Sequence, residues 1–264
     1  MTSPPDVPTL ERLAARSWRG LEEAPYGDWL LRAGGGFTGR ANSVLVTGEP
    51  PAPLGTAVDR VTRWYADRGL RPRAQVPLPG AGHADEAFAA AGWDRDEDVL
   101  VLTAPLVGGE AVDVRVDLRG EPDDAWLEGY RYRGTPLPPV ARAVLMSADD
   151  PVFAAVRLDP EPAPLAAVAR GVVVDGWLVV TAVTVAERYR RRGLATAVMS
   201  ALGNWAIGRG GHSSVLQVVA SNAPALALYD RLGFSEHHRY HYRLGPAPAS
   251  VSEGDRLPAP GGAG

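Results

Sequence analysis

Four arginines in front of a glycine form the part of this sequence best suited to chemistry. The segment reads Arg188-Tyr189-Arg190-Arg191-Arg192-Gly193. It follows Val179 to Val185, a stretch of small and β-branched apolar residues that is typical of a buried strand. From Leu194 onward, apolar residues recur at helical spacing. The sequence therefore predicts a strand, a tight basic turn and a helix in succession.

A turn of this kind is suited to hold a diphosphate. The first amide N–H groups of a helix have no partner within the helix and lie at the positive end of its dipole. Guanidinium groups beside them add charge-assisted hydrogen bonds to phosphate oxygens. The alternative is a turn whose charges are only solvated. A P-loop is excluded because no Gly-Lys-Ser/Thr ends the segment, and no G-x-G-x-x-G after a strand indicates a Rossmann site.

Two motifs resemble the signatures of the GNAT superfamily of N-acyltransferases. Arg190 to Ala195 (RRRGLA) is similar to its acyl-CoA-binding signature, Arg/Gln-x-x-Gly-x-Gly/Ala. Downstream, Asn222 to Phe234 (NAPALALYDRLGF) is similar to its second signature. A helix and a strand separate the two motifs, in the family's order. The resemblance implies an α/β (α+β) fold, with a GNAT-like mixed β-sheet flanked by helices, and acetyl-CoA as co-substrate.

The resemblance also implies which residues bind acyl-CoA. The diphosphate would lie on the basic turn and the first helical turn, formed by Arg190, Arg191, Arg192, Gly193, Leu194, Ala195 and Thr196. Backbone groups of Val183, Thr184 and Val185 would hydrogen-bond the pantetheine arm, and an N–H there would polarise the thioester carbonyl. Asn222 matches a polar position that contacts the pantetheine or organises the next helix, with an ordinary N-cap as an equal alternative.

Tyr229 is the candidate catalytic residue, because it matches the tyrosine of the second signature. Its phenol would protonate or stabilise the leaving thiolate, and the alternative is a half-buried packing tyrosine. The general base stays unassigned, since the strand Trp177 to Val185 contains no acidic residue. Glu187 is better explained as a solvent-exposed ion pair and Asp175 as a turn residue. A water chain or backbone carbonyls remain as proton carriers.

The expected elements repeat along the chain. A helix ending at Gly69, a strand, a helix ending in Gly92-Trp93 and a strand reappear in this order after Leu194. We therefore expect two tandem GNAT-like units, residues 1–104 and 111–245, followed by a disordered tail, residues 246–264. The first unit has GEPPAPLG in place of the basic turn, so it is not expected to bind CoA. It either shapes the acceptor pocket or only supports the fold.

Several residues in the first unit are polar enough to touch an acceptor. Arg32 and Arg40 are candidates to hold an acidic or polar acceptor. The alternative is that these two residues, together with Asn42 and Ser43, cap turns or are solvated.

Hydrophobic patterning also predicts further elements. Helices are expected at Pro8–Leu21, Pro122–Arg131 and Leu137–Ala148, and strands at Trp29–Ala33, Ala41–Val46 and Val112–Leu118. A turn is expected at Gly34–Gly39 and a hairpin turn at Asp175-Gly176.

Composition excludes several classes of protein. The net charge of −4 and a pI near 5.8 argue against nucleic acid as the main partner. The absence of cysteine excludes disulfides and thiolate zinc sites, and His237, His238 and His241 lack the spacing of a metal site. No apolar run reaches about 18 residues and no signal peptide is evident, so we expect a cytoplasmic protein without membrane or metal partners.

The leading hypothesis is an N-acetyltransferase that transfers an acetyl group directly from acetyl-CoA to a primary amine. The acceptor would be a small molecule or a peptide. A non-catalytic acyl-CoA-binding or sensor protein is the first alternative, because no base is evident. The second alternative is a module that sequesters a small molecule between the two units. The oligomeric state is not predicted.

Overall fold

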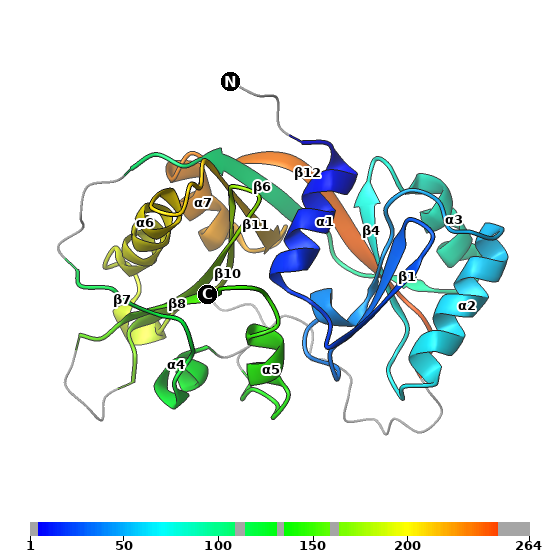
Figure 1. Ribbon diagram of the computed structural model, residues 1–264, viewed down its shortest axis with the longest axis horizontal. Coiled ribbons are helices and arrows are strands. Elements are labelled where there is room, and N and C mark those ends of the chain that lie inside the picture. The colour runs from blue at the N-terminus through cyan, green and yellow to red at the C-terminus, as the bar shows by residue number, and fades with distance from the viewer. Residues whose placement is uncertain (1–4, 109–113, 131–134, 159–163, 248–264) are drawn as a thin grey trace.

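Among the residues that the structure describes, one mixed sheet of twelve strands organises the chain (Figure 1). The computed structural model describes residues 5–108, 114–130, 135–158 and 164–247. Most of the tail expected to be disordered, and the start of the strand expected at Val112–Leu118, lie outside these ranges. Among the described residues, no helix has the length and apolar character needed to span a membrane.

The N-terminal half contains helices on a curved set of strands. Its elements are α1 (Val7–Ser17), β1 (Glu22–Tyr26), β2 (Trp29–Ala33), the 3-10 turn η1 (Arg40–Asn42), β3 (Val44–Leu45), α2 (Leu54–Ala66), β4 (Arg73–Leu78), α3 (Gly82–Ala90), β5 (Asp94–Arg95) and β6 (Val99–Pro105).

The C-terminal half follows a similar plan. Its elements are β7 (Asp117–Arg119), α4 (Asp124–Gly129), α5 (Ala141–Leu145), β8 (Val152–Val156), β9 (Ala167–Val174), β10 (Trp177–Val185), the 3-10 turn η2 (Glu187–Tyr189), α6 (Leu194–Ile207), β11 (Ser213–Val219), α7 (Ala223–Arg231) and β12 (Ser235–Leu244).

The two halves share their last strands. The strand order is β1-β2-β3-β4-β12-β6-β11-β10-β9-β8-β7, with β5 also paired to β12. The N-terminal strand β6 lies between β11 and β12, and the C-terminal strand β12 lies between β4 and β6. All of these pairings are antiparallel. Each half therefore completes the sheet of the other, across the proposed boundary at residues 104–111.

The internal repeat is visible in the backbone. In each half a helix connects two parallel strands: α2 lies between the paired strands β3 and β4, and α6 between β10 and β11. Gly92 and Gly233 end α3 and α7 at φ 78° and 80°. In both places the next amide reaches the carbonyl five residues back, from Trp93 to Phe88 and from Phe234 to Tyr229, at 3.0 Å. These helix ends follow the same left-handed glycine motif, as the repeat predicts.

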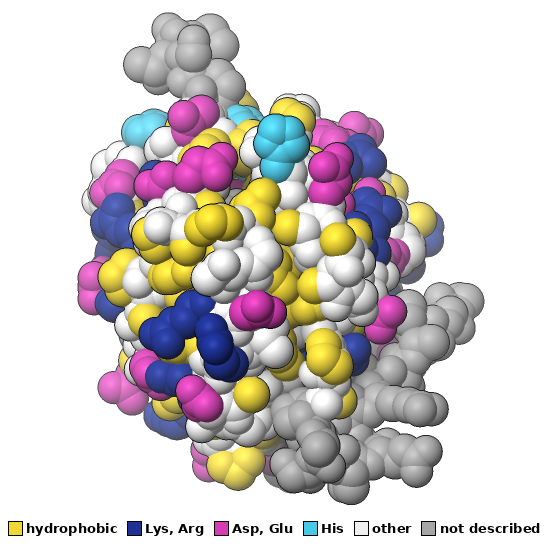
Figure 2. Space-filling model, turned by 90° about the vertical axis from the view of Figure 1, so that its right-hand side faces the viewer, with side chains coloured by type: hydrophobic (Ala, Val, Ile, Leu, Met, Phe, Trp, Pro, Cys, Tyr) yellow, Lys and Arg dark blue, Asp and Glu magenta, His cyan; other side chains and the backbone are white. Residues whose placement is uncertain are grey.

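Helices cover both faces of the sheet. Leu10 and Leu13 of α1 pack on one face, in a buried cluster that includes Val179 and Val215 of the central strands. Helix α6 covers the opposite face, where Val198 and Leu202 join a second cluster. Helices α2 and α3 cover the end of the molecule that the N-terminal half forms (Figure 1). Figure 2 shows this end from outside, with both basic and acidic side chains on its surface. Helix α1 thus lies over strands from both halves.

Several predicted elements differ from the observed ones. The first helix ends at Ser17, not Leu21, and a strand that was not predicted, β1, pairs with β2. The turn of that hairpin therefore precedes Trp29, and Gly34–Gly39 instead leads into η1 and the short strand β3. Strand β6 continues to Pro105, just beyond the expected end of the first unit at residue 104. The hairpin turn at Asp175-Gly176 is confirmed, with both residues at positive φ.

Candidate functional site

The two central parallel strands diverge and leave a gap. Strands β10 and β11 pair from Trp177–Ser213 to Val180–Leu216 and no further among the described residues. Beyond this point β10 stays paired with β9, and β11 with β6. The edge of β10 that faces β11 is therefore left without a strand partner. Its backbone N–H and C=O groups are available to a ligand in the gap.

A β-bulge lies at the start of this gap. The register of β10 against β9 shifts between Thr181 and Thr184, and Ala182 has φ 57°. Bulges of this kind bend a strand and redirect its backbone groups. Val183, Thr184 and Val185 follow the bulge and are partly exposed. The structure thus places these three predicted pantetheine-binding residues along the gap.

The basic turn has the predicted strand-to-helix geometry. Gly193 is the N-cap of α6 at φ 74°, and no side chain caps the helix. The first intrahelical bond is made by the amide of Ala197, so the amides of Leu194, Ala195 and Thr196 lack helical partners. A Cβ built on Gly193 meets no atom within 4 Å. The surface above the helix N-terminus is therefore open to an anion.

Three exposed arginines surround this helix end, and a buried tyrosine anchors the turn. Arg190, Arg191 and Arg192 are exposed. Tyr189 is buried in the cluster that also contains Leu194, and the Arg192 guanidinium lies 5.8 Å from its ring centroid. The anchor fixes the turn while the arginines stay accessible. This arrangement fits a diphosphate through both amides and guanidinium groups.

Tyr229 lies in the same buried cluster as the anchor of the basic turn. The cluster also contains Val180 and Leu216, the last paired residues before the gap. The Tyr229 ring packs edge-on against Phe234 at 5.8 Å. Burial raises the pKa of the Tyr229 phenol to about 12. The side chain therefore keeps its proton near neutral pH, as a proton donor to a thiolate must.

Asn222 performs the capping role. Its side-chain oxygen accepts a hydrogen bond from the amide of Ala225 at 3.3 Å, and the residue is exposed. It is the N-cap of α7, so of the two expected roles the structure shows the cap that organises this helix. A direct pantetheine contact stays a prediction.

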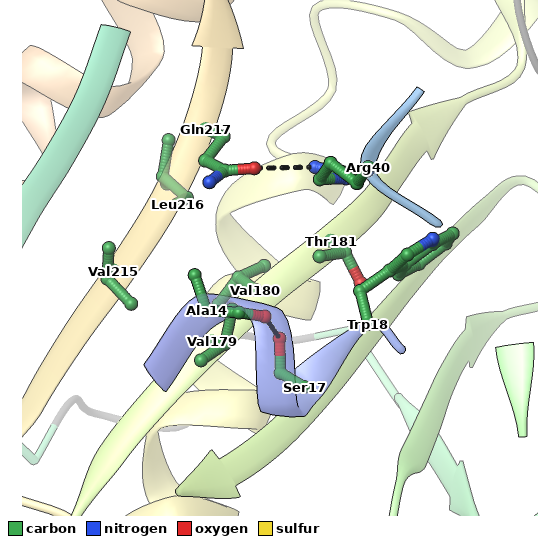
Figure 3. A pocket seen from close by; sticks show the side chains of 10 residues that line it. All are labelled: Ala14, Ser17, Trp18, Arg40, Val179, Val180, Thr181, Val215, Leu216 and Gln217. Carbon is green, nitrogen blue, oxygen red and sulfur yellow. Dashed lines mark hydrogen bonds between the residues drawn. The ribbon is translucent and has the colours of Figure 1, made fainter. Parts of the chain in front are cut away.

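On the α1 face, residues from both halves enclose a small cavity where the strands begin to diverge. Figure 3 shows Arg40 pointing toward Gln217 across it. The cavity measures about 10 Å³, which is room for about one water molecule. Its lining residues are Ala14, Ser17, Trp18, Arg40, Val179, Val180, Thr181, Val215, Leu216 and Gln217. The N-terminal half therefore forms part of the wall.

The polar residues predicted near an acceptor have different roles. Arg40 lines the cavity and donates a hydrogen bond to the Gln217 side-chain oxygen at 3.3 Å. Arg32 is buried and bonded to Ser43 and Gln75, so it supports the fold. Asn42 accepts hydrogen bonds from the amides of Gly34 and Gly36. Arg32 therefore does not join Arg40 at the cavity, because its guanidinium is bonded to Ser43 and Gln75.

A buried polar network behind α1 was not anticipated. Glu11 and His238, whose side chains are each 1% exposed, are joined at 2.8 Å from Glu11 Oε1 to His238 Nε2. Gln75 donates to the other Glu11 oxygen at 2.7 Å, and His237 reaches His238 at 2.8 Å. No group of three or more metal-ligating side chains occurs within the described ranges. Helical periodicity alone gave no sign that Glu11 was buried, because its partners come from distant strands.

Comparison with known proteins identifies the family. A family model described as "Probable histone acetyltransferase Rv0428c C-terminal" matches residues 4–243. The chain belongs to this family of GNAT acetyltransferases. This GNAT chain is 28% identical to the "Uncharacterized N-acetyltransferase YobR" of Bacillus subtilis over 258 residues, which cover 90% of it and 98% of YobR.

Further relatives agree with this assignment. The "Probable histone acetyltransferase Rv0428c" of Mycobacterium tuberculosis is 31% identical over 250 residues, covering 89% of the GNAT chain and 73% of that protein. A GCN5-related N-acetyltransferase structure from Kribbella flavida aligns with a TM-score of 0.64 at 14% identity, over 92% and 97% of the two chains. A tandem GNAT protein from the clavulanic acid biosynthesis pathway aligns with a TM-score of 0.54 at 13% identity, and the alignment covers 95% of this chain and 91% of that protein. The fold class predicted from the sequence is confirmed.

Proposed function

We propose that this chain transfers an acetyl group from acetyl-CoA to the primary amine of a small-molecule or peptidyl acceptor, by direct attack. The observation that carries the proposal is the open helix N-terminus at Gly193, with exposed arginines around it, next to the gap beyond Val180. An acyl carrier with a diphosphate fits the first feature and its extended arm fits the second. The GNAT fold and the acetyltransferase names of both relatives support this proposal.

The residues of the chain perform separate parts of this reaction. The basic turn holds the diphosphate, and the free edge of β10 beyond the bulge at Ala182 orients the arm and polarises the carbonyl. The amine nitrogen forms a bond to the carbonyl carbon, the carbon–sulfur bond breaks, and the sulfur takes a proton from Tyr229. The amine loses a proton to solvent through a carrier that we leave unassigned, since β10 contains no acid, and the Tyr229 phenolate takes a proton back from solvent.

Two assays test this function. Calorimetry with acetyl-CoA measures binding, and release of the CoA thiol in the presence of a panel of amines measures transfer. We expect both to be positive. Binding without amine-dependent release would favour the acyl-CoA sensor. No binding of acetyl-CoA by the folded protein would exclude both the transferase and the sensor.

A peptidyl acceptor deserves a place in the panel. The Mycobacterium tuberculosis relative is named a probable histone acetyltransferase and is 31% identical over 89% of this chain. A lysine-rich peptide is therefore one arm of the amine panel, beside small amines. Nucleic acid and membranes are not proposed as partners.

A further inference from the structure

Polar atoms without partners gather around the cavity between the two halves. Among the described residues, five buried side-chain nitrogen or oxygen atoms have no hydrogen-bond partner. Two belong to residues that line the cavity, Nε1 of Trp18 and Oγ1 of Thr181, and a third is Nη2 of Arg170. Buried polar atoms are rarely left unpaired. Their grouping at one place therefore points to an occupant.

Arg170 lies directly behind the cavity wall. It pairs with Thr181 in the register of β9 and β10, so the two side chains are neighbours on the same face of the sheet. Its Nε donates to the Leu145 carbonyl at 2.8 Å and its Nη1 to the Ser17 carbonyl at 3.0 Å. Its guanidinium lies 5.1 Å from the centroid of the Trp18 ring. The position of this charge is therefore fixed by backbone groups.

The charge at this place is positive and is not neutralised by Arg170's own contacts. The Arg40 guanidinium lies 4.8 Å from the same Trp18 ring. Burial and the nearby Arg40 lower the pKa of Arg170 to about 9, so the side chain is still charged at pH 7. Within the described part of the chain no carboxylate forms an ion pair with Arg170. A buried cation favours an anion beside it.

We propose that the acceptor amine carries a carboxylate, and that this cavity receives one of its oxygens. The inference rests on the proposed transferase function and names the acceptor class. Trp18 and Arg40 supply N–H groups that can donate hydrogen bonds to this oxygen, and Thr181 supplies a hydroxyl. Arg170 supplies a positive charge behind them. The cavity has room for about one water. A terminal carboxylate oxygen in place of that water fits, whereas a phosphate group does not.

The same charges disfavour a basic peptide as acceptor. A lysine-rich segment would bring further cations toward two guanidinium groups that lie 4.8 and 5.1 Å from the centroid of one indole ring. Like charges in a poorly hydrated site repel strongly. The preferred acceptor is therefore a small amino acid or a similar amine with a carboxylate at its far end.

The test compares matched acceptors on the wild-type protein. Each amino acid, together with β-alanine and γ-aminobutyrate, is assayed beside its own carboxamide, and a lysine-rich peptide forms a further arm. Release of the CoA thiol is followed with a thiol reagent, which meets no cysteine in this protein. We expect at least one carboxylate acceptor to exceed its carboxamide by about 10- to 100-fold in kcat/KM.

Variants assign the preference to the cavity. Thr181→Val and Arg40→Gln should reduce the carboxylate preference about tenfold, and Arg170→Met should reduce it further. Arg68→Gln is the matched control, because the Arg68 guanidinium also lies over an indole ring, that of Trp64, but at the outer helix α2. Since Arg170→Met can fail to fold, the other two variants carry the test. Calorimetry with acetyl-CoA should give unchanged affinity in all of them.

The outcomes separate the two proposals. Loss of acetyl-CoA binding in the folded wild-type protein contradicts the transferase itself. A protein that binds acetyl-CoA but prefers the carboxamides or the lysine-rich peptide overturns the acceptor inference alone. If no amine is acetylated, thermal stabilisation by N-acetyl amino acids is compared with that by their amides. Equal stabilisation by both, or none, also overturns the inference.

Discussion

The Arg40 guanidinium donates a hydrogen bond to the Gln217 side-chain oxygen at 3.3 Å, across 177 positions of the sequence. Arg40 comes from η1 in the N-terminal half, and Gln217 from β11, next to the point where the central strands diverge. Tyr240 donates to the same Gln217 oxygen at 3.3 Å. The half that lacks the basic turn thus contributes directly to the wall of the proposed acceptor cavity.

Gly193→Glu should abolish CoA binding, because it places a carboxylate where phosphate is expected. Residues other than glycine also cost about 1–2 kcal/mol at such a positive φ. Gly210→Glu controls for both effects: Gly210 lies beyond the other end of α6 at φ 78°, with open space around its Cβ. Calorimetry with acetyl-CoA should separate the two variants by at least a hundredfold. Equal affinities would refute the diphosphate site.

Tyr229→Phe should lower kcat by about 10²- to 10⁴-fold, the usual contribution of a general acid, with CoA affinity nearly unchanged. Because its pKa is raised to about 12, the phenol stays protonated through the accessible range, and kcat should show no loss from its ionisation below about pH 10. Tyr65→Phe removes another buried hydroxyl, in the N-terminal core, as a control. Turnover equal to that of the wild type would leave Tyr229 as a packing residue only.

Glu11→Ala should destabilise the protein strongly. It leaves buried His238 and Gln75 without their shared carboxylate, and loss of one partner from a buried pair costs about 3–5 kcal/mol. Urea unfolding measures the difference. Glu86→Ala, at an exposed position of α3, should stay within about 0.5 kcal/mol of the wild type. A Glu11 variant as stable as the Glu86 variant contradicts the importance of the network.

Acid should weaken the contact between β12 and α3. His241 Nε2 lies 2.6 Å from Asp85 Oδ1, and burial lowers the pKa of His241 below 6.5. Burial would raise the pKa of Asp85, but hydrogen bonds from Arg243 and His241 outweigh it and hold that pKa below 3.8. In both cases the unfolded chain binds more protons in acid, so the unfolding free energy falls as the pH falls.

The histidine contribution should appear first, as the pH drops below about 6.5. Urea unfolding between pH 7.5 and 5 should give a shallower pH dependence for His241→Gln than for the wild type. His83→Gln removes an exposed histidine from α3 and should keep the wild-type slope. Identical slopes in all three proteins would show that His241 does not couple folding to pH. Asp85 should add a further loss only below about pH 4.

Cutting the chain within residues 109–113 should leave a folded complex of two fragments. Each fragment alone should fail to fold, because β6 needs β11 and β12, and β12 needs β4. Size-exclusion chromatography of the co-expressed fragments and of each separate fragment checks this. A separate C-terminal fragment that folds and binds acetyl-CoA would show that the exchanged strands are dispensable.

The sequence predicted the local parts of the site well. The bounds of β10, the start of α6 at Leu194 and the glycine ends of α3 and α7 follow from short-range patterns and match the structure. The strand exchange was not predictable in this way. Nothing local in Val99–Pro105 distinguishes pairing with β11 from pairing with β4, because either neighbour buries the same apolar residues.

The residues of the cavity show the same limit. Arg170 stands within an apolar strand, and its burial depends on the carbonyls of Ser17 and Leu145, which are 153 and 25 residues away. No local sequence pattern identifies either of these two carbonyl groups as a partner of Arg170. Arg40 is a candidate from the sequence because its side chain can hold an acidic or polar group, but its pairing with Gln217 depends on the folded sheet. The proposed acceptor site therefore depends on long-range contacts more than the proposed CoA-binding turn does.

The shared strands also determine how such a protein can assemble. If the halves were separate chains, the exchange of β6 and β12 would make an obligate dimer, and its stability would depend on protein concentration. Covalent connection makes that encounter intramolecular, so dilution should not separate the two sides of the proposed active site. It also fixes a ratio of one unit with the basic turn to one unit without it.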